Sequence, residues 1–415
     1  MHLKSYTRWW APALMLAGLT ASLAVYSKPA AARLSGPPVA GATVLNGIDV
    51  LVRENFAPLR GLRVGLLTNH TGTDRQRRST IDLLRQAPGV ELRVLFSPEH
   101  GIRGDRDDKI GDGRDEKTGL PIFSLYGENR SPSPQQLADL DALVFDIQDV
   151  GCRFYTYIST LKQAMFAASR AGLKFFVLDR ANPINGRAVE GPLLVGAPSF
   201  IACHALPVRH GLTVGELALL FKQESGLALE LKVIRVQGWH RDMWFDQTGQ
   251  PWANPSPNMR NLNEATLYPG IGLLEFAALS VGRGTDTPFE VLGAPYIDDL
   301  VLAAELNRSR LPGIRFVPVR FTPKASVYQG QNCGGVYMIV TERERLAAVD
   351  VGIEVARILH RLYPADFKVE KMGDLLRHPQ TIEAIKAGRT LAEIKKLWKA
   401  DLRAFAARRE RFIQY

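Results

Sequence analysis

Polar side chains follow directly after two apolar stretches, and their types suit acid–base chemistry on a small polar molecule. The first stretch, residues 92–96, precedes the run Ser-Pro-Glu-His-Gly at 97–101. The second, residues 142–145, precedes Asp-Ile-Gln-Asp-Val-Gly-Cys-Arg-Phe-Tyr-Thr-Tyr at 146–157. In an open parallel α/β sheet, ligands bind beyond the carboxyl ends of the strands. Carboxylates, a histidine, an arginine and tyrosines at these positions therefore predict a reaction site on that edge.

Glu99 is the first candidate for a catalytic group. It is a carboxylate that follows a buried strand beside Pro98, so the backbone holds it stiffly at the sheet edge. Partial burial there favours the protonated form from which a general acid works. The alternative is a structural role as a helix cap or as the ion-pair partner of Arg103. His100 is a second acid–base candidate or a ligand-binding donor.

The second run supplies two more catalytic candidates, Asp146 and Asp149, and two substrate-binding candidates, Arg153 and Tyr155. Asp149 has an alternative role, because an aspartate also stabilises the N-terminus of a following helix. Arg153 offers a planar fork of donors that matches a substrate carboxylate.

Two further strand ends carry hydrogen-bonding groups. Asn69 and His70 follow the apolar residues 63–68, and Asn182 follows residues 174–178. We expect all three to bind substrate, with Asn182 as a partner for a sugar hydroxyl. For Asn69 the alternative is a turn in which its side chain bonds its own backbone.

Signatures of several other chemistries are missing from the sequence. It has neither the glycine spacing of a dinucleotide site nor a phosphate loop, which argues against a dehydrogenase or a kinase. It has no HExxH spacing for zinc and no G-x-S-x-G turn for a serine hydrolase. We therefore expect neither a cofactor nor a metal ion.

The elements that must position these residues form an α/β fold. Apolar strands that alternate with helical patterns predict a parallel sheet covered on both faces. The predicted strands are 63–68, 91–96, 142–147, 174–178 and 231–236, and the predicted helices are 79–86, 156–171 and 215–224. A proline-rich segment, residues 252–259, precedes strands at 316–321 and 336–341 and helices at 345–362 and 391–411. We place the catalytic domain at 47–265 and a smaller α+β domain at 266–415.

The N-terminal residues have the order of a secretory signal peptide. Lys4 and Arg8 precede an apolar run at 9–25, and three alanines follow at 30–32. We predict a signal peptide at 1–32, a leader at 33–46, and a secreted or periplasmic protein without a stable membrane anchor. A retained anchor is the alternative, although the run is short for a membrane span.

The net charge of +10 favours an anionic partner. The cations are dispersed, without the basic stripe that binds nucleic acid, so we expect no nucleic-acid partner.

The runs at 97–104, 146–151 and 153–157 resemble signature runs of the NamZ-type exo-β-N-acetylmuramidases, formerly a domain of unknown function. Further matches lie at 178–180, 182–183, 208–211, 255–259 and 282–285. The resemblance implies a Rossmann-like N-terminal domain with a cleft, a smaller C-terminal domain, and removal of terminal N-acetylmuramic acid from the non-reducing end of peptidoglycan fragments. It also implies that Glu99 is the essential acid. Two residues depart from the family pattern, Ala181 in place of a proline and Cys152 in place of a small residue.

Glycoside hydrolysis agrees with these residues. A positioned acid protonates the leaving oxygen while a second group assists from the opposite side. Asp146, Asp149 or the N-acetyl group of the sugar is the candidate for that second group. The lactyl carboxylate of muramic acid requires a cationic partner, for which Arg153 and Arg103 are the candidates. A periplasmic binding protein for cell-wall sugars and a metal-dependent hydrolase remain as alternatives.

Overall fold

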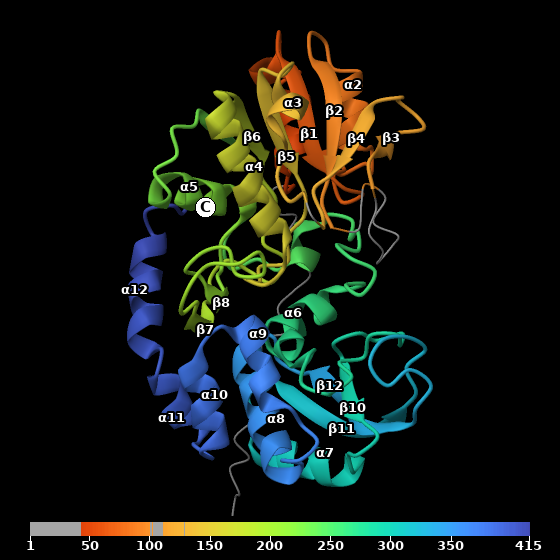
Figure 1. Ribbon diagram of the computed structural model, residues 1–415, viewed down its shortest axis with the longest axis vertical. Coiled ribbons are helices and arrows are strands. Elements are labelled where there is room, and N and C mark those ends of the chain that lie inside the picture. The colour runs from red at the N-terminus through yellow and green to blue at the C-terminus, as the bar shows by residue number, and fades with distance from the viewer. Residues whose placement is uncertain (1–42, 100–101, 103–110, 128) are drawn as a thin grey trace, which may run out of the picture. The chain divides into compact units, whose positions relative to one another are not determined.

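Seven strands build the central sheet of the N-terminal half, in the order β3-β4-β2-β1-β5-β6-β9 (Figure 1). The structure is a computed structural model, and it describes residues 43–99, 102, 111–127 and 129–415. The strands are β1 (Arg63–Thr68), β2 (Glu91–Ser97), β3 (Gly113–Arg114), β4 (Pro121–Ser124), β5 (Ala142–Asp146), β6 (Lys174–Leu178) and β9 (Leu231–Ile234). All pairings are parallel except that of β3 with β4. The predicted α/β class is confirmed.

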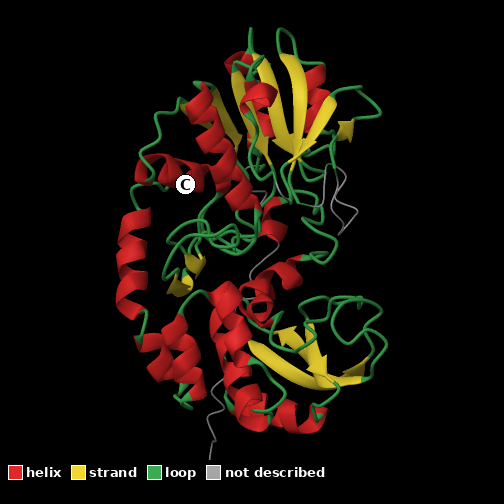
Figure 2. Ribbon diagram, in the orientation of Figure 1, coloured by secondary structure: helices red, strands yellow, loops and turns green. Residues whose placement is uncertain are grey.

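Helices cover both faces of this sheet because successive side chains of a strand point to opposite sides. Leu66, Val144 and Phe176 belong to a core shared with α1 (Gly47–Arg53) and α2 (Thr80–Arg85). Their neighbours Leu67, Phe145 and Val177 belong to the core on the other face. That second face is covered by α3 (Pro134–Leu137), α4 (Tyr157–Ala171) and α5 (Val214–Glu224) (Figure 2).

The C-terminal half contains a three-stranded antiparallel sheet in the order β10-β12-β11. Its strands are β10 (Val291–Ala294), β11 (Ile314–Phe321) and β12 (Cys333–Val340), and its helices are α6 (Leu262–Ile271), α7 (Asp299–Arg308) and α8 (Ala348–Leu362). Pro318 lies within β11, which tolerates it because β11 is an edge strand. A parallel-sheet N-terminal domain and a smaller α+β C-terminal domain are therefore as predicted.

Helices α6 and α8 approach so closely that only glycines fit between them. A Cβ on Gly270 would lie 1.8 Å from the carbonyl oxygen of Ala348, and one on Gly352 would lie 2.3 Å from that of Gly270. This contact holds α6 against α8 in one orientation. It thereby also positions the residues that follow α6.

Several short elements complete the chain. They are the hairpin β7 (Glu190–Leu193) and β8 (Pro207–Arg209), helices α9 (Gly373–Leu376), α10 (Pro379–Lys386), α11 (Leu391–Lys396) and α12 (Lys399–Arg409), and the 3-10 turns Ala57–Leu59, Phe245–Thr248, Gly272–Leu274 and Val369–Met372. The single helix predicted at 391–411 was wrong. Trp398 has non-helical angles (φ −121°, ψ 4°) and is buried edge-on against His378, so the helix breaks there.

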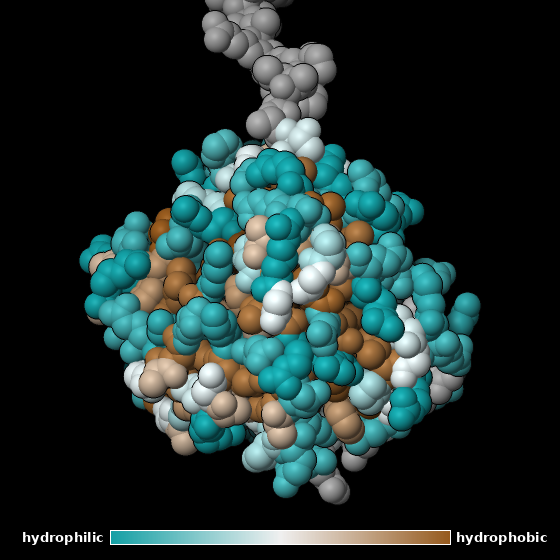
Figure 3. Space-filling model, turned by 90° about the horizontal axis from the view of Figure 1, so that it is seen from above, coloured by the Kyte–Doolittle hydropathy of each residue, from teal (hydrophilic) through white to brown (hydrophobic). Residues whose placement is uncertain are grey.

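The described residues from 43 to 415 pack as one compact unit, and the predicted domain limits at 265 and 266 stay a prediction. The predicted signal peptide lies outside the described residues, as does most of the leader. None of the helices described is both long and apolar enough to cross a membrane. Figure 3 views the molecule from above, and the described surface on that side is mostly hydrophilic with hydrophobic areas between.

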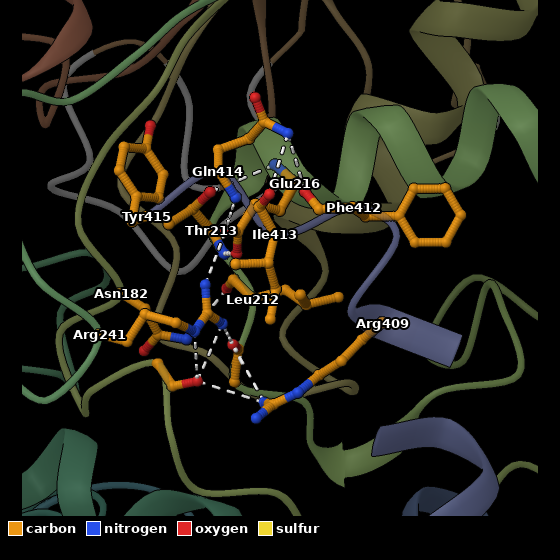
Figure 4. Close-up of polar contacts among 12 residues, drawn as sticks. Asn182, Leu212, Thr213, Glu216, Arg241, Arg409, Phe412, Ile413, Gln414 and Tyr415 are labelled. Carbon is orange, nitrogen blue, oxygen red and sulfur yellow. Dashed lines mark hydrogen bonds and ion pairs between the residues drawn. The ribbon is translucent and has the colours of Figure 1, made fainter. Parts of the chain in front are cut away.

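Residues 412–415 return to the N-terminal half, where Gln414 contacts Glu216 of α5 (Figure 4). The Tyr415 hydroxyl donates to Asp179 Oδ2 at 2.6 Å and accepts from the backbone N–H of Val236 at 2.9 Å. The backbone N–H of Gln414 donates to Glu216 Oε1 at 2.9 Å, and the same oxygen accepts from Arg241 at 2.6 Å. The end of the described chain is thus bonded to buried acids of the parallel-sheet domain.

We expect Tyr415→Phe to lower the free energy of unfolding by about 1–3 kcal/mol, because a buried carboxylate and a backbone N–H lose their partner. Tyr363→Phe is the control, since its hydroxyl accepts from an exposed backbone N–H, that of Asp298. Denaturant unfolding measures both. Equal stability of Tyr415→Phe and the parent would show that this contact does not hold the segment in place.

Candidate functional site

A cavity of about 200 Å³ opens beside Glu99, at the carboxyl end of β2. Phe154, Tyr155 and Tyr157 line it from the start of α4, and both halves of the chain contribute the rest. The other lining residues are Thr156, Ile201, Ser256, Met259, Tyr268, Glu275, Phe276, Arg283, Phe289 and Leu375. β2 and β5 pair with opposite edges of β1, so the order in which strands are added to the sheet reverses at β1. Ligands bind at such switch points of open α/β sheets.

Glu99 is held at this edge by one hydrogen bond. The Thr156 hydroxyl donates to Glu99 Oε2 at 2.5 Å, and Thr156 directly precedes α4. The carboxyl group is half-buried and lines the cavity. One carboxyl oxygen is therefore fixed by the protein while the group as a whole faces the space where a ligand fits.

Aromatic rings form much of the cavity wall. Tyr155 packs edge-on against Tyr157, with ring centroids 5.0 Å apart, and against Tyr268 at 5.8 Å. Tyr268 in turn contacts Phe154 at 5.1 Å and Phe289 at 4.8 Å. Burial raises the pKa of Tyr157, and the nearby charge of Glu99 adds to this effect. These tyrosines are neutral at physiological pH and act as hydrogen-bonding groups and apolar surfaces.

Two of the predicted site residues, Glu99 and Tyr155, are brought together in the cavity. His100 and Arg103 lie outside the described residues. Six other candidates are described and do not line the cavity; each has contacts within the fold. They are Asn69, His70, Asp146, Asp149, Arg153 and Asn182.

Asp146 is fully buried in a two-pronged ion pair with Arg180, whose Nε and Nη2 lie 2.6 and 3.0 Å from its two oxygens. Thr80 donates to the same carboxylate at 2.5 Å. A carboxylate with both oxygens engaged, away from the cavity, stabilises the strand ends. The structure therefore gives Asp146 a structural role, and the catalytic role predicted for it gains no support from this geometry.

Arg153 is fully buried, and its guanidinium donates to four backbone carbonyl oxygens. Nη1 reaches those of Pro192 (3.1 Å) and Leu206 (2.9 Å), and Nη2 those of Leu375 (3.0 Å) and Leu376 (2.6 Å). Burial lowers its pKa to about 10, so the group stays charged at neutral pH. Both Nη groups of Arg153 are used within the protein, and its side chain does not line the cavity, so the structure gives no support to the prediction that it binds a substrate carboxylate.

The side chains of Asn69, His70 and Asn182, which follow strands, also contact backbone groups. Asn69 Oδ1 accepts from the backbone N–H and the hydroxyl of Thr71, at 2.9 and 2.6 Å, which is the turn that we considered as its alternative. His70 Nε2 lies 2.5 Å from the carbonyl oxygen of Asn254. Asn182 is buried and donates to the carbonyl of Leu212 at 3.0 Å, so this geometry gives no support to its predicted role as a sugar partner.

Asp149 is buried beside His210, with its Oδ2 3.8 Å from His210 Nε2. The backbone N–H of Gly151 donates to Asp149 Oδ2 at 2.7 Å. Burial raises the pKa of Asp149 to about 7 and lowers the pKa of His210 to about 3. Since Asp149 does not line the cavity, the catalytic role predicted for it gains no support from this geometry.

The sequence reasoning missed the contribution of the C-terminal half, above all Arg283 and Glu275. Arg283 Nε lies 3.1 Å from Glu275 Oε1, and both side chains line the cavity. The signal for Arg283 was present in the run Gly-Arg-Gly-Thr at 282–285, which matched the family signature without being assigned a role. Glu275 had no comparable sequence signal.

Comparison with known proteins identifies the fold and its family. Two family models match, "Exo-beta-N-acetylmuramidase NamZ, N-terminal" over residues 64–263 and its C-terminal counterpart over residues 266–415. The chain belongs to the NamZ exo-β-N-acetylmuramidase family. It is 42% identical over 378 residues to the peptidoglycan β-N-acetylmuramidase NamZ of Bacillus subtilis, covering 90% of this chain and 91% of that protein.

Two crystal structures of DUF1343 family proteins from Bacteroides fragilis are also similar to this family member. One aligns with a TM-score of 0.85 at 36% identity, and the other with 0.74 at 29%. Each comparison covers 90% of this chain and 99% of the other. The cavity described above therefore lies in a chain that matches the family along almost its whole described length.

Within the described residues, no three His, Cys, Asp or Glu side chains form a group that could hold a metal ion.

We expect Arg153→Met to lower the free energy of unfolding by about 3–5 kcal/mol, because four buried carbonyl groups lose their donors at once. Arg85→Met, at an exposed position of α2, is the matched control and should change it by less than about 0.5 kcal/mol. Denaturant titration measures both variants. A loss below about 1 kcal/mol for Arg153→Met would contradict the role assigned to this guanidinium.

Asp149 makes stability depend on pH. Its pKa in the folded protein, about 7, exceeds the ordinary value of 3.8, so its contribution is complete below about pH 4 and is lost as the pH rises through 7. Asp149→Asn keeps an acceptor for Gly151 but cannot ionise. We expect its advantage over the parent to grow from pH 4 to 7, to about 4 kcal/mol, and then to level off.

The measurement is the free energy of unfolding of both proteins between pH 4 and 8.5. Asp286→Asn, at a fully exposed side chain, is the control and should show no such trend. A constant difference between Asp149→Asn and the parent at all pH values would mean that Asp149 is ionised throughout.

Proposed function

We propose that this protein is an exo-acting glycosidase that releases terminal N-acetylmuramic acid from the non-reducing end of peptidoglycan fragments. The observation that carries the proposal is that Glu99 faces an aromatic-walled cavity in a chain of the exo-β-N-acetylmuramidase family. The B. subtilis relative is a peptidoglycan β-N-acetylmuramidase, which supports the same polymer as the substrate here. The small volume of the cavity suits a chain end.

Glu99 acts in this proposal as the general acid. Glycosidic cleavage proceeds through an oxocarbenium-like state, and its leaving oxygen needs a proton. Thr156 donates to Glu99 Oε2, which leaves the other carboxyl oxygen to carry the proton to the substrate. Tyr155, Tyr268 and Phe289 offer ring faces and edges against which the apolar side of a sugar packs.

The second catalytic group belongs in the same cavity. Asp146 is engaged by Arg180, and Asp149 does not line the cavity. The N-acetyl group of the sugar, which we considered from the start, is our candidate for that role.

Export is part of the proposal. The predicted signal peptide at 1–32 carries the enzyme to the periplasm or the exterior, where wall fragments arise, and release of the terminal sugar then serves cell-wall turnover.

The alternative function is a periplasmic binding protein that captures wall sugars without cleaving them. Both functions need a polar cavity with aromatic walls. Only the hydrolase needs a proton donor at residue 99. An assay of substrate turnover therefore distinguishes the two functions.

We expect Glu99→Gln to reduce release of N-acetylmuramic acid from a muramic-acid-terminated disaccharide by at least about 100-fold, with binding largely retained. With an activated aryl glycoside the loss should be much smaller, because a good leaving group departs without protonation. Reducing-sugar release, aryl release and calorimetric binding measure the three quantities.

Glu91→Gln, an exposed position on the same strand, is the matched control and should keep the parent rate. Turnover by Glu99→Gln at the parent rate would show that the acid is another group. Failure of the parent protein to release any sugar would favour the binding protein. Excess EDTA in the same assay tests the metal-dependent hydrolase, and we expect activity to persist.

A further inference from the structure

Arg283 is the cation among the described residues that line the Glu99 cavity. Its side chain is 38% exposed, whereas those of Arg153 and Arg180 are at most 5% exposed. Arg153 serves four backbone carbonyls and Arg180 serves Asp146. Of these three guanidinium groups, Arg283 is the one that the cavity presents to a ligand.

The backbone around Arg283 is built to present it. Gly282 and Gly284 flank it with φ of 81° and 80°, a conformation that other residues rarely adopt. A Cβ on Gly284 would lie 2.3 Å from the carbonyl oxygen of Ala325, and one on Gly282 would lie 2.8 Å from that of Thr287. The turn therefore packs tightly against its neighbours, and the long side chain between the glycines starts from a fixed point.

Glu275 orients the guanidinium. Its Oε1 lies 3.1 Å from Arg283 Nε, and its side chain is only 14% exposed. A guanidinium carries five N–H donors in a rigid fork, so one edge can bind Glu275 while it also binds a second acceptor. Because Glu275 already restricts the Arg283 side chain, the guanidinium loses less conformational entropy when it binds a carboxylate.

The charges of this pair lie close to the acid of the proposed mechanism. The Tyr268 hydroxyl is influenced by all three groups, since burial raises its pKa, Glu275 and Glu99 raise it further, and Arg283 lowers it. Tyr268 and Tyr155 line the same cavity and pack edge-on against each other, with ring centroids 5.8 Å apart. A single ligand in a cavity of about 200 Å³ therefore meets Glu99 and Arg283 together.

We infer that Arg283, oriented by Glu275, is a carboxylate-binding subsite that recognises the lactyl group of the terminal N-acetylmuramic acid and so distinguishes it from N-acetylglucosamine. The inference rests on the proposed function. It replaces Arg153, which the fold uses, as the cationic partner of the lactyl carboxylate. N-acetylglucosamine lacks this carboxylate, and its binding leaves Arg283 without the added charge-assisted hydrogen bonds. The C-terminal half of the chain thereby supplies sugar specificity, and the N-terminal half supplies the acid.

The test pairs one change in the protein with one change in the substrate. Three aryl β-glycosides are compared, those of N-acetylmuramic acid, of its neutral lactyl amide, and of N-acetylglucosamine. The proteins are the parent, Arg283→Gln, Arg283→Lys and the control Arg315→Gln, at an exposed position of β11. The measured quantity is kcat/KM for each pair.

We expect the parent to prefer the acid over the amide by about 10- to 100-fold, the range of a charged hydrogen-bonded contact. Arg283→Gln should lose that preference, because its kcat/KM on the acid falls about 10- to 100-fold further than its kcat/KM on the amide or on N-acetylglucosamine. Arg283→Lys should keep part of the preference, and Arg315→Gln all of it.

The outcomes separate the two proposals. A parent that cleaves none of the three glycosides contradicts the proposed function. A parent that cleaves the acid and the amide equally well contradicts the inference, whether or not the Arg283 variants fold. A variant Arg283→Gln that keeps the full preference for the acid also overturns it.

Discussion

The buried guanidinium of Arg153 is the contact on which the site depends. It donates to carbonyls at Pro192 and Leu206 in the N-terminal half and at Leu375 and Leu376 in the C-terminal half. A buried carbonyl oxygen left without a partner costs about 1–3 kcal/mol, and of these four the Leu206 oxygen also accepts from the backbone N–H of Leu194. Since Phe154, Tyr155 and Tyr157 follow Arg153 directly and line the cavity, the same contact positions the aromatic wall. Leu375 itself lines the cavity as well.

Most polar residues at the strand ends stabilise the carboxyl edge of the parallel sheet and do not line the cavity. Asp146 and Arg180 join the ends of β5 and β6, and Asp179 accepts from Thr213, the backbone of Gly215 and Tyr415. A parallel sheet leaves backbone groups and helix termini exposed at this edge, so buried side chains must satisfy them. The edge is therefore rigid, and Glu99 has a fixed frame from which to act.

The cavity is a joint product of the two halves of the chain. The parallel-sheet half gives Glu99 and the α4 aromatics, and the α6-to-β10 segment gives Tyr268, Glu275 and Arg283. The glycine contact between α6 and α8 holds that segment in place. Glu99 and Arg283 thus come from elements that are almost two hundred residues apart in sequence, and in our proposal the chemistry and the choice of sugar rest on these separate elements.

The sequence by itself determined five of the seven strands of the sheet and indicated Glu99 as the candidate acid. Runs of buried residues at 63–68 and 174–178 give β1 and β6 at their predicted bounds, because a strand covered on both faces must be apolar throughout. Glu99 was found because a carboxylate after such a strand emerges at the ligand edge. Sequence also indicated the family, through several signature runs in order.

Only the tertiary structure decided which polar residues serve the fold. Arg153, Asp146 and Asn182 have the types expected of ligand-binding residues, but they meet unsatisfied backbone groups or an opposite charge from distant segments. Local sequence holds no information about those partners. For the same reason Glu275 could not be found, since its place in the cavity that Glu99 also lines arises when the two halves of the chain pack together. Element types follow from local periodicity, whereas the role of a polar side chain follows from what packing places against it.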